Sequence, residues 1–417
     1  MRLWLLSLLL LFLAGGARAE LWTIAHIGDP QNGTSCVGLP DAWSYFSAGV
    51  QWIADAGPTE FQLAVIPGDL VNTVNLGDSC YCQNLATCVA GEKDPITNAF
   101  CSVGDPPCND ANAQACVGGT AGTYCEWTRA QTLTGYLSTG NVAWAVVAGN
   151  RDQRADYALY NMHFGALSQL SSATSIVDRG IYQLSSTKPV NSYQVIVTPT
   201  GARFLNIAIS FDALEYMNSS VVAWVQSVMA RYDRMPTILT THTSIDHDCA
   251  NAAYENAWCG GTVTTAWEGN VIFDTLAQDP QVFLVIGGHI AGRMSAFTST
   301  PSGYPLASIA TDYSKYDTGD APGVPDWAIA ANGGGGVVTS IRIDTVTGQI
   351  NTKAYSPYAA SEGIAGGPWV KTGGEEGSEL SMNVPMCADR NRFDLPDAAC
   401  PKVVKVRAVD LGNIRKR

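Results

Sequence analysis

The stretch "VVAGNRD", Val146 to Asp152, carries the pattern that decides the fold. A short apolar run, typical of a buried strand, stops at Gly149 and is followed directly by an amide, a guanidinium and a carboxylate. Buried parallel strands read as continuous apolar runs, so the polar residues after them lie at the carboxyl edge of a sheet. We therefore expect Asn150, Arg151 and Asp152 to belong to a site at such an edge.

Four other apolar runs end in the same way, at residues that can bind a metal ion. These residues are Asp29 and Gln31 after "LWTIAHIG", Asp69 after "FQLAVIPG", His242 after "TILTT" and His289 after "VFLVIGG". A further run, "RFLNIAIS", ends at Phe211 and Asp212 and suggests no ligand role. His26 lies inside a predicted strand, and we expect it to be a core residue.

Helical patterns separate these strands. Apolar residues recur at spacings of three and four in two segments, one with Trp43, Phe46, Val50 and Ile53 and the other with Val221, Trp224, Val228 and Met229. Such stripes normally pack on a sheet. Alternation of strands and helices predicts an α/β architecture.

The first 19 residues resemble an export signal. Arg2 precedes an apolar run, and Ala17, Arg18 and Ala19 give the small-x-small pattern of a cleavage site. A membrane anchor is the alternative, but the run is shorter than the roughly 18 apolar residues that a span needs. We expect a secreted or lumenal protein with no membrane contact after cleavage, and glycosylation sequons begin at Asn32 and Asn218.

The twelve cysteines are even in number, which in an exported chain favours disulfides over free thiols. Eight of them lie between Cys36 and Cys125, many in a segment, residues 73–128, that we interpret as a disulfide-rich insertion; zinc binding is the alternative. Cys249 with Cys259 and Cys387 with Cys400 are predicted to close local loops. We expect the rest of the chain to form one domain over residues 20–365, which carries this insertion, and a C-terminal extension over residues 366–417.

The net charge of −13 disfavours polyanionic partners. Nucleic acid is therefore not expected as a partner, and the oligomeric state stays open. The strand-end residues point to a different ligand. Oxygen and imidazole donors without thiolate suit zinc, manganese or iron, and a shared carboxylate can hold two such ions.

The motifs "GDPQ", "GDL", "GNRD", the histidine of "THTS" and "GGHIAG" resemble, in this order, the five blocks of the calcineurin-like metallophosphoesterases. The family pattern is DxH, GDxx, GNHD, H and GHxH. The resemblance covers roughly Leu21 to Pro357, apart from the insertion. It implies an α/β fold in which two mixed β-sheets are sandwiched between helices, giving four layers.

The resemblance also implies a set of metal ligands. Asp29 and Gln31 would bind a first ion, Asp69 would bridge, and the second ion would be bound by Asn150, His242 and His289. The sequence departs from the family at three positions, where Gln31, Arg151 and Ala291 replace histidines. Because Ala291 offers no ligand, we expect one firmly bound divalent ion and a second that is weak or absent.

The expected function is hydrolysis of phosphate mono- or diesters, in small or macromolecular substrates, by metal-activated hydroxide. Arg151 and Asp152 are the catalytic candidates: Arg151 would bind phosphate oxygens but cannot donate a proton, and Asp152 would orient its neighbours. The first alternative is a weakened or inactive family member that binds metal or phosphate. The second is extracellular recognition through the insertion.

Overall fold

The computed structural model describes residues 20–30, 42–71, 81–82, 123–153, 157–213, 219–247, 263–265, 268–290, 292–300, 302–312, 336–362, 382–397 and 399–400. Several expectations concern residues outside this set, namely the export signal, Gln31, Ala291, both sequons, the Cys249–Cys259 loop and most of the insertion. Among the described helices, none has the length and apolar character needed to cross a membrane.

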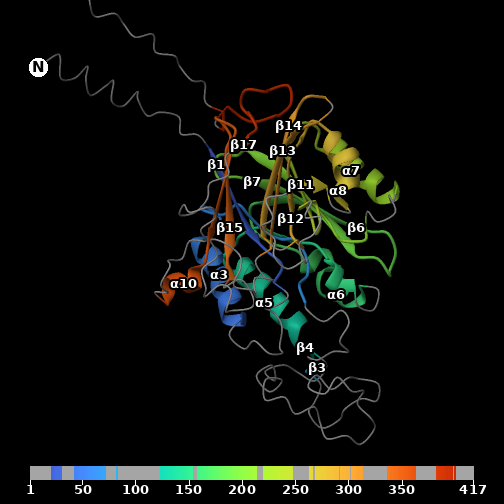
Figure 1. Cartoon of the computed structure of the whole chain (residues 1–417), viewed down its shortest axis with the longest axis vertical. Coiled ribbons are helices and arrows are strands. Elements are labelled where there is room, and N and C mark those ends of the chain that lie inside the picture. Colours follow the sequence, from blue (N-terminus) through green and yellow to red (C-terminus); the bar gives the residue numbers. More distant parts are fainter. Residues whose placement is uncertain are drawn as a thin grey trace, which may run out of the picture.

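One of the two large sheets has six strands and is mixed. Its strand order is β17 (Met382–Asn383), β16 (Gln349–Tyr355), β15 (Val338–Asp344), β1 (Leu21–Ile27), β2 (Leu63–Ile66) and β5 (Trp144–Val146). Figure 1 labels β1, β15 and β17 of this sheet. Strands β1, β2 and β5 run parallel, whereas β15, β16 and β17 add antiparallel pairs on the other side of β1. Three of the predicted motif-bearing strands are therefore adjacent and point the same way.

The other large sheet has seven strands and is also mixed. Its order is β13 (Gly292–Ser299), β14 (Pro305–Asp312), β12 (Val282–Gly287), β9 (Thr237–Thr241), β8 (Arg203–Ile209), β7 (Val190–Val197) and β6 (Ile176–Gln183). The four strands from β14 to β8 are parallel, and the edges are antiparallel. Strands β9 and β12, which precede the two motif histidines, are neighbours.

The two sheets pack against each other through a shared apolar core. Trp22 of β1 stacks on Phe204 of β8 with ring centroids 5.1 Å apart, and Phe283 of β12 meets the same indole edge-on. These rings belong to one buried cluster that draws side chains from both sheets. Because the inner faces are both apolar, the sheets form a sandwich.

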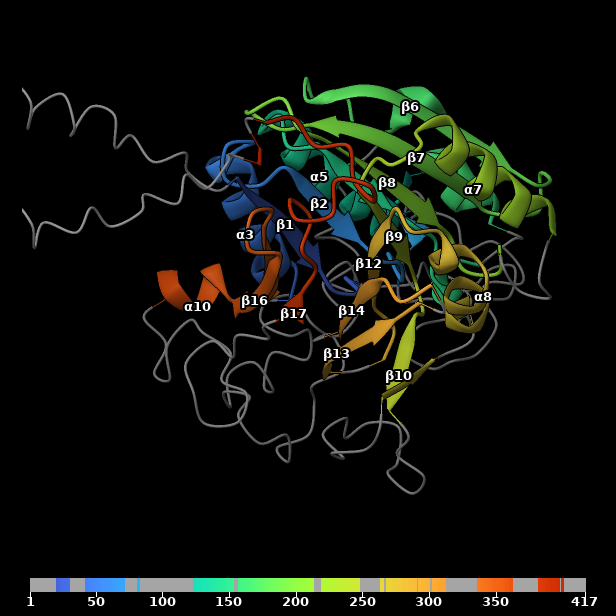
Figure 2. The ribbon, with the colours of Figure 1, turned by 90° about the horizontal axis from the view of Figure 1, so that it is seen from above.

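Helices cover the outer faces. Helices α3 (Ala42–Ala56), α5 (Cys125–Thr139) and α6 (Ala158–Phe164) contribute to a core on the six-stranded sheet. Helices α7 (Ser219–Arg231) and α8 (Glu268–Asp274) cover the seven-stranded sheet, and Figure 2 shows α3 and α7 on opposite sides of the two sheets. The four layers confirm the expected fold class, and α3 and α7 match the two predicted helical stripes.

Smaller elements complete the described chain. They are η1 (Asn150–Gln153), η2 (Leu167–Gln169), η3 (Leu276–Gln278), α10 (Pro357–Ser361) and two short antiparallel pairs, β3 (Tyr81–Cys82) with β4 (Thr123–Tyr124) and β10 (Ile245–His247) with β11 (Val263–Thr265). Helix α5 begins at Cys125, inside the segment that we interpreted as a loop-rich insertion.

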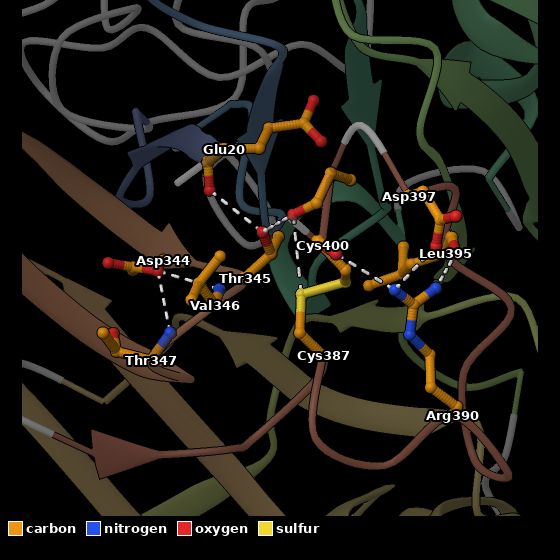
Figure 3. Close-up of a disulfide and its surroundings, with 11 residues drawn as sticks. Glu20, Asp344, Thr345, Val346, Thr347, Cys387, Arg390, Leu395, Asp397 and Cys400 are labelled. Carbon is orange, nitrogen blue, oxygen red and sulfur yellow. Dashed lines mark hydrogen bonds and ion pairs between the residues drawn. A yellow bond between two sulfur atoms is a disulfide. The ribbon is translucent and has the colours of Figure 1, made fainter. Parts of the chain in front are cut away.

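The described residues between 382 and 400, here called the C-terminal clasp, pack on the sandwich. Strand β17 pairs with β16, and Cys387 and Cys400 form the predicted disulfide (Figure 3). The buried Arg392 donates hydrogen bonds to three backbone carbonyls, those of Pro280, Val282 and Pro305. The clasp therefore joins the six-stranded sheet to the amino ends of β12 and β14.

Candidate metal centre

Five strand ends supply the residues of the candidate site. In the six-stranded sheet, Asp29 follows β1, Asp69 follows β2 and Asn150 follows β5. In the seven-stranded sheet, His242 follows β9 and His289 follows β12. Each set comes from adjacent parallel strands, so its members reach one edge of their sheet, as the apolar runs predict.

Four of these side chains meet at one point. Asp29, Asp69, His242 and His289 each offer a ligand atom, and these atoms all lie within 4.8 Å of one another. The first three residues are fully buried and His289 is partly exposed. The structure thus brings together two carboxylates and two imidazoles that are up to 260 residues apart in the chain.

The ring of His242 has a defined tautomer. Its Nδ1 lies 2.8 Å from the carbonyl oxygen of Pro67, and since a carbonyl only accepts, Nδ1 carries the proton. In the neutral ring the lone pair is then on Nε2, which lies 3.1 Å from Oδ1 of Asn150 and 3.4 Å from Oδ1 of Asp69. A lone pair and two oxygen acceptors converge there, which is the arrangement that a bound cation requires.

Arg151 sits beside Asp69 at the rim of the cluster. Its backbone N–H donates to Oδ1 of Asp69 over 2.9 Å, and its Nε lies 3.6 Å from Oδ2 of the same carboxylate. The Arg151 side chain is 36% exposed, whereas that of Asp69 is fully buried. Arg151 therefore presents positive charge to the solvent side of the centre, where an anionic ligand would enter.

Asp152 acts on the backbone around the site. Its carboxylate accepts hydrogen bonds from the amides of Gly149, Leu70 and Val71, at 2.8, 3.1 and 3.2 Å. It is fully buried, and burial raises the pKa of Asp152 well above its usual value, with the negative charge of Asp69 adding to the rise. The geometry makes Asp152 a positioning residue, because it ties the turn after β5 to the loop after β2.

Glycines before the ligands permit the close packing. A Cβ on Gly149 would lie 2.3 Å from Oδ1 of Asp69, and one on Gly288 would lie 2.4 Å from Oδ1 of Asp29. Asp69 and His289 themselves have positive φ, 48° and 68°, a conformation that costs of order 1–3 kcal/mol outside glycine. Strained backbone is expected where side chains must converge on a ligand.

Contacts between rings and backbone hold the two histidines. Their ring centroids are 4.6 Å apart in an edge-on arrangement, and the backbone N–H of His289 donates to Oδ2 of Asp29 over 2.9 Å. Phe211, which follows β8, packs edge-on against His242, with the two ring centroids 5.6 Å apart. The sequence alone suggested no role for the residues after β8. The pattern that could have revealed Phe211 is that β8 belongs to the same set of parallel strands as β9 and β12.

The other conspicuous histidine, His26, lies apart from the cluster. It is fully buried, its Nδ1 is 2.7 Å from Oγ1 of Thr311, and burial lowers the pKa of His26 to about 3. It is a core residue that links β1 to β14. Its role therefore matches the expectation from the sequence.

The donor set fits a divalent cation. Two buried carboxylates, two imidazoles and the Asn150 amide oxygen are ligands that suit zinc, manganese or iron. Two carboxylate charges buried without water are costly unless positive charge balances them. Arg151 supplies one such charge at the rim, and a divalent ion among the ligand atoms would supply more than the remainder.

Comparison with known proteins finds likeness at the level of structure and not of sequence. No protein-family model matches this chain, and no curated protein matches it. Its fold is similar to a solved structure of a dimetal phosphatase from Danio rerio, with a TM-score of 0.40 and 10% sequence identity. The match covers 87% of this chain and 99% of that chain.

Proposed function

We propose that this protein is an exported metal-dependent phosphoesterase that hydrolyses phosphate mono- or diesters. One observation carries the proposal: the ligand atoms of Asp29, Asp69, His242 and His289 lie within 4.8 Å of one another. The same residues stand in the motifs that resemble the calcineurin-like metallophosphoesterases. Export is proposed from the N-terminal sequence pattern.

The proposed cofactor is a divalent ion, zinc, manganese or iron, of which one is firmly bound and a second is weak or absent. Asp29, Asp69, His242 and His289 would hold it, with Asn150 beside His242 and Gln31 as an additional oxygen ligand proposed from the sequence alone. When bound, such an ion polarises a phosphoryl oxygen and lowers the pKa of water.

The chain's own residues bind and orient the substrate. The Arg151 guanidinium lies at the rim, where it can hold phosphate oxygens in a bidentate arrangement. A guanidinium does not serve as a general acid, so Arg151 offers no proton to a leaving group. Loss of general acid help typically costs about 10²- to 10⁴-fold in rate, so we expect a preference for esters with good leaving groups.

The immediate test is hydrolysis of nitrophenyl phosphate mono- and diesters with added manganese or zinc. We expect turnover by the wild type and a large loss in Asn150→Ala, since Asn150 contacts the ligand nitrogen of His242. Asn391→Ala, which changes an exposed amide in the clasp, is the matched control and should retain full activity. No hydrolysis by wild type, with Asn150→Ala indistinguishable from it, would rule out catalysis.

A second candidate function is binding of metal or phosphate without turnover. The ion pair between Arg151 and Asp69 favours it, because an arginine at this position binds anions and supplies no proton. Calorimetric titration with inorganic phosphate, run beside the hydrolysis assay, separates the two functions. Binding without product would support the second candidate, whereas product formation would support the first.

A further inference from the structure

The four ligand atoms lie close to the spacing that a single shared ion allows. Two ligands bound to the same zinc or manganese ion at about 2.1 Å can be at most about 4.2 Å apart. All four atoms lie within 4.8 Å of one another, so side-chain shifts of a few tenths of an ångström would let a single ion reach all of them. This set contains both Asp29 and His242, which the family resemblance assigns to different ions.

The two oxygens of Asp69 have different surroundings. Oδ1 lies 3.4 Å from Nε2 of His242 and points into the cluster, whereas Oδ2 lies 3.6 Å from Nε of Arg151. A carboxylate that bridges two ions presents one oxygen to each of them. Here a guanidinium lies on the side of the second oxygen.

The charges favour the same arrangement. One divalent ion and the Arg151 cation together exceed the two negative charges of Asp29 and Asp69 by a single positive charge. A second divalent ion on Oδ2 of Asp69 would lie next to the Arg151 guanidinium in a largely buried site, where repulsion between like charges is poorly screened. Phosphate could then neutralise the remaining positive charge.

We infer that the centre is mononuclear, that Asp29, Asp69, His242 and His289 all bind the same ion, and that the Arg151 guanidinium takes the place of a second cation. This inference rests on the proposed metal-dependent function and goes further by assigning the ligands to one ion. It gives Arg151 two tasks, balancing the charge of Asp69 and binding the substrate phosphate.

Metal loading of the full chain with Mn²⁺ tests the inference without any assay of activity. We expect one ion per chain at saturation, by equilibrium dialysis with elemental analysis, and the electron paramagnetic resonance hyperfine pattern of an isolated Mn²⁺ ion. Two ions per chain with an exchange-coupled spectrum would overturn the mononuclear centre and leave the proposed function standing. No bound ion would overturn both.

Ligand variants test the assignment of residues. Asp29→Ala and His242→Ala should each weaken binding of the one Mn²⁺ ion by at least about tenfold, a loss that even indirect contacts to a metal cause. A centre with separate ions would instead leave one ion at wild-type affinity in Asp29→Ala. Such a result would overturn the assignment.

Arg151 has a matched pair of variants. Arg151→Lys keeps the positive charge and should bind Mn²⁺ as the wild type does. Arg151→Gln removes the charge, and we expect it to bind Mn²⁺ several-fold more tightly or to admit a second ion. Unchanged affinity and unchanged stoichiometry in Arg151→Gln would contradict the role of Arg151 as a substitute cation.

Discussion

The two ends of the strand sandwich are built on different principles. At the carboxyl ends, buried carboxylates and imidazoles crowd one point, and Asp69 and His289 adopt positive φ. At the amino ends of β12 and β14, the C-terminal clasp forms a disulfide, and the buried Arg392 hydrogen-bonds three backbone carbonyls. The first end concentrates buried carboxylates and backbone strain, whereas the second combines a covalent cross-link with a buried guanidinium that has three carbonyl partners.

This difference indicates a division of labour between the ends. Sites that bind ligands commonly carry strain and unfavourable electrostatics, and the rest of the fold must offset them. We therefore expect changes at the metal centre to alter function with little loss of stability. Changes in the clasp should do the reverse, and the following experiments test that separation.

The largest effect is expected for Asp69→Asn. This change replaces the central carboxylate by a neutral and weaker amide ligand, and we expect kcat/KM for nitrophenyl phosphate esters to fall by about a thousandfold, from the several kcal/mol that metal catalysis supplies. The metal-free protein should melt at the wild-type temperature or above, because one charge buried beside Asp152 is gone and asparagine tolerates positive φ. Scanning calorimetry of both proteins with chelator measures the two melting temperatures. A melting temperature of Asp69→Asn far below that of wild type would show that the metal-centre residues also stabilise the fold.

Next in size is Arg392→Met in the clasp. Three carbonyl oxygens, on Pro280, Val282 and Pro305, lose a charged donor, so we expect a loss of about 3 kcal/mol in the free energy of unfolding. Urea denaturation measures it. Metal affinity should stay as in the wild type. If Arg392→Met were as stable as the wild type but bound metal poorly, the clasp would serve the metal centre and not stability, contrary to the account.

Removal of the disulfide is a milder test of the same end. The bond between Cys387 and Cys400 closes a loop with a sequence separation of 13, for which chain entropy gives about 2–3 kcal/mol. We expect the double variant Cys387→Ser, Cys400→Ser to unfold at lower urea concentration by that amount. Its activity at low temperature should be unchanged, which a hydrolysis assay checks directly.

The smallest effect expected is the pH dependence that His26 contributes. Its pKa is about 3 in the folded protein and near 6.5 unfolded, so between these values the unfolded state binds more protons. Stability from this residue is complete above pH 6.5 and falls by about 2 kcal/mol between pH 7 and pH 5. Urea denaturation with chelator at several pH values gives the free energy of unfolding of wild type and of His26→Gln, and the difference between them isolates the contribution of His26. If the free energies of the two proteins changed in parallel with pH, the prediction would be wrong.

Much of the fold and site followed from local patterns. The motif strands are short, buried and rich in apolar residues, with threonines in β9 and Thr23 and His26 in β1, and in each case a glycine or threonine directly precedes the ligand. Parallel neighbours then bring those ends together. The amphipathic stripes of α3 and α7 were equally clear, since one face of each packs on a sheet.

Other features depend on contacts that no local pattern reveals. The C-terminal segment was predicted as an extension, but β17 has two residues and Arg392 reaches carbonyls more than a hundred positions earlier in the chain. The start of α5 at Cys125 was hidden by the cysteine-rich composition around it. Phe211 looked like an ordinary strand end because its ring contact with His242 is not itself a sequence pattern; only the place of β8 in the same parallel set pointed to the site.

The central claim is that four distant side chains form one metal centre. It is tested most directly by a crystal structure of the manganese-loaded protein with anomalous diffraction from the metal. We expect one strong anomalous peak within bonding distance of Asp29, Asp69, His242 and His289, beside the Arg151 guanidinium. Absence of any peak at these residues in fully loaded protein would contradict the claim.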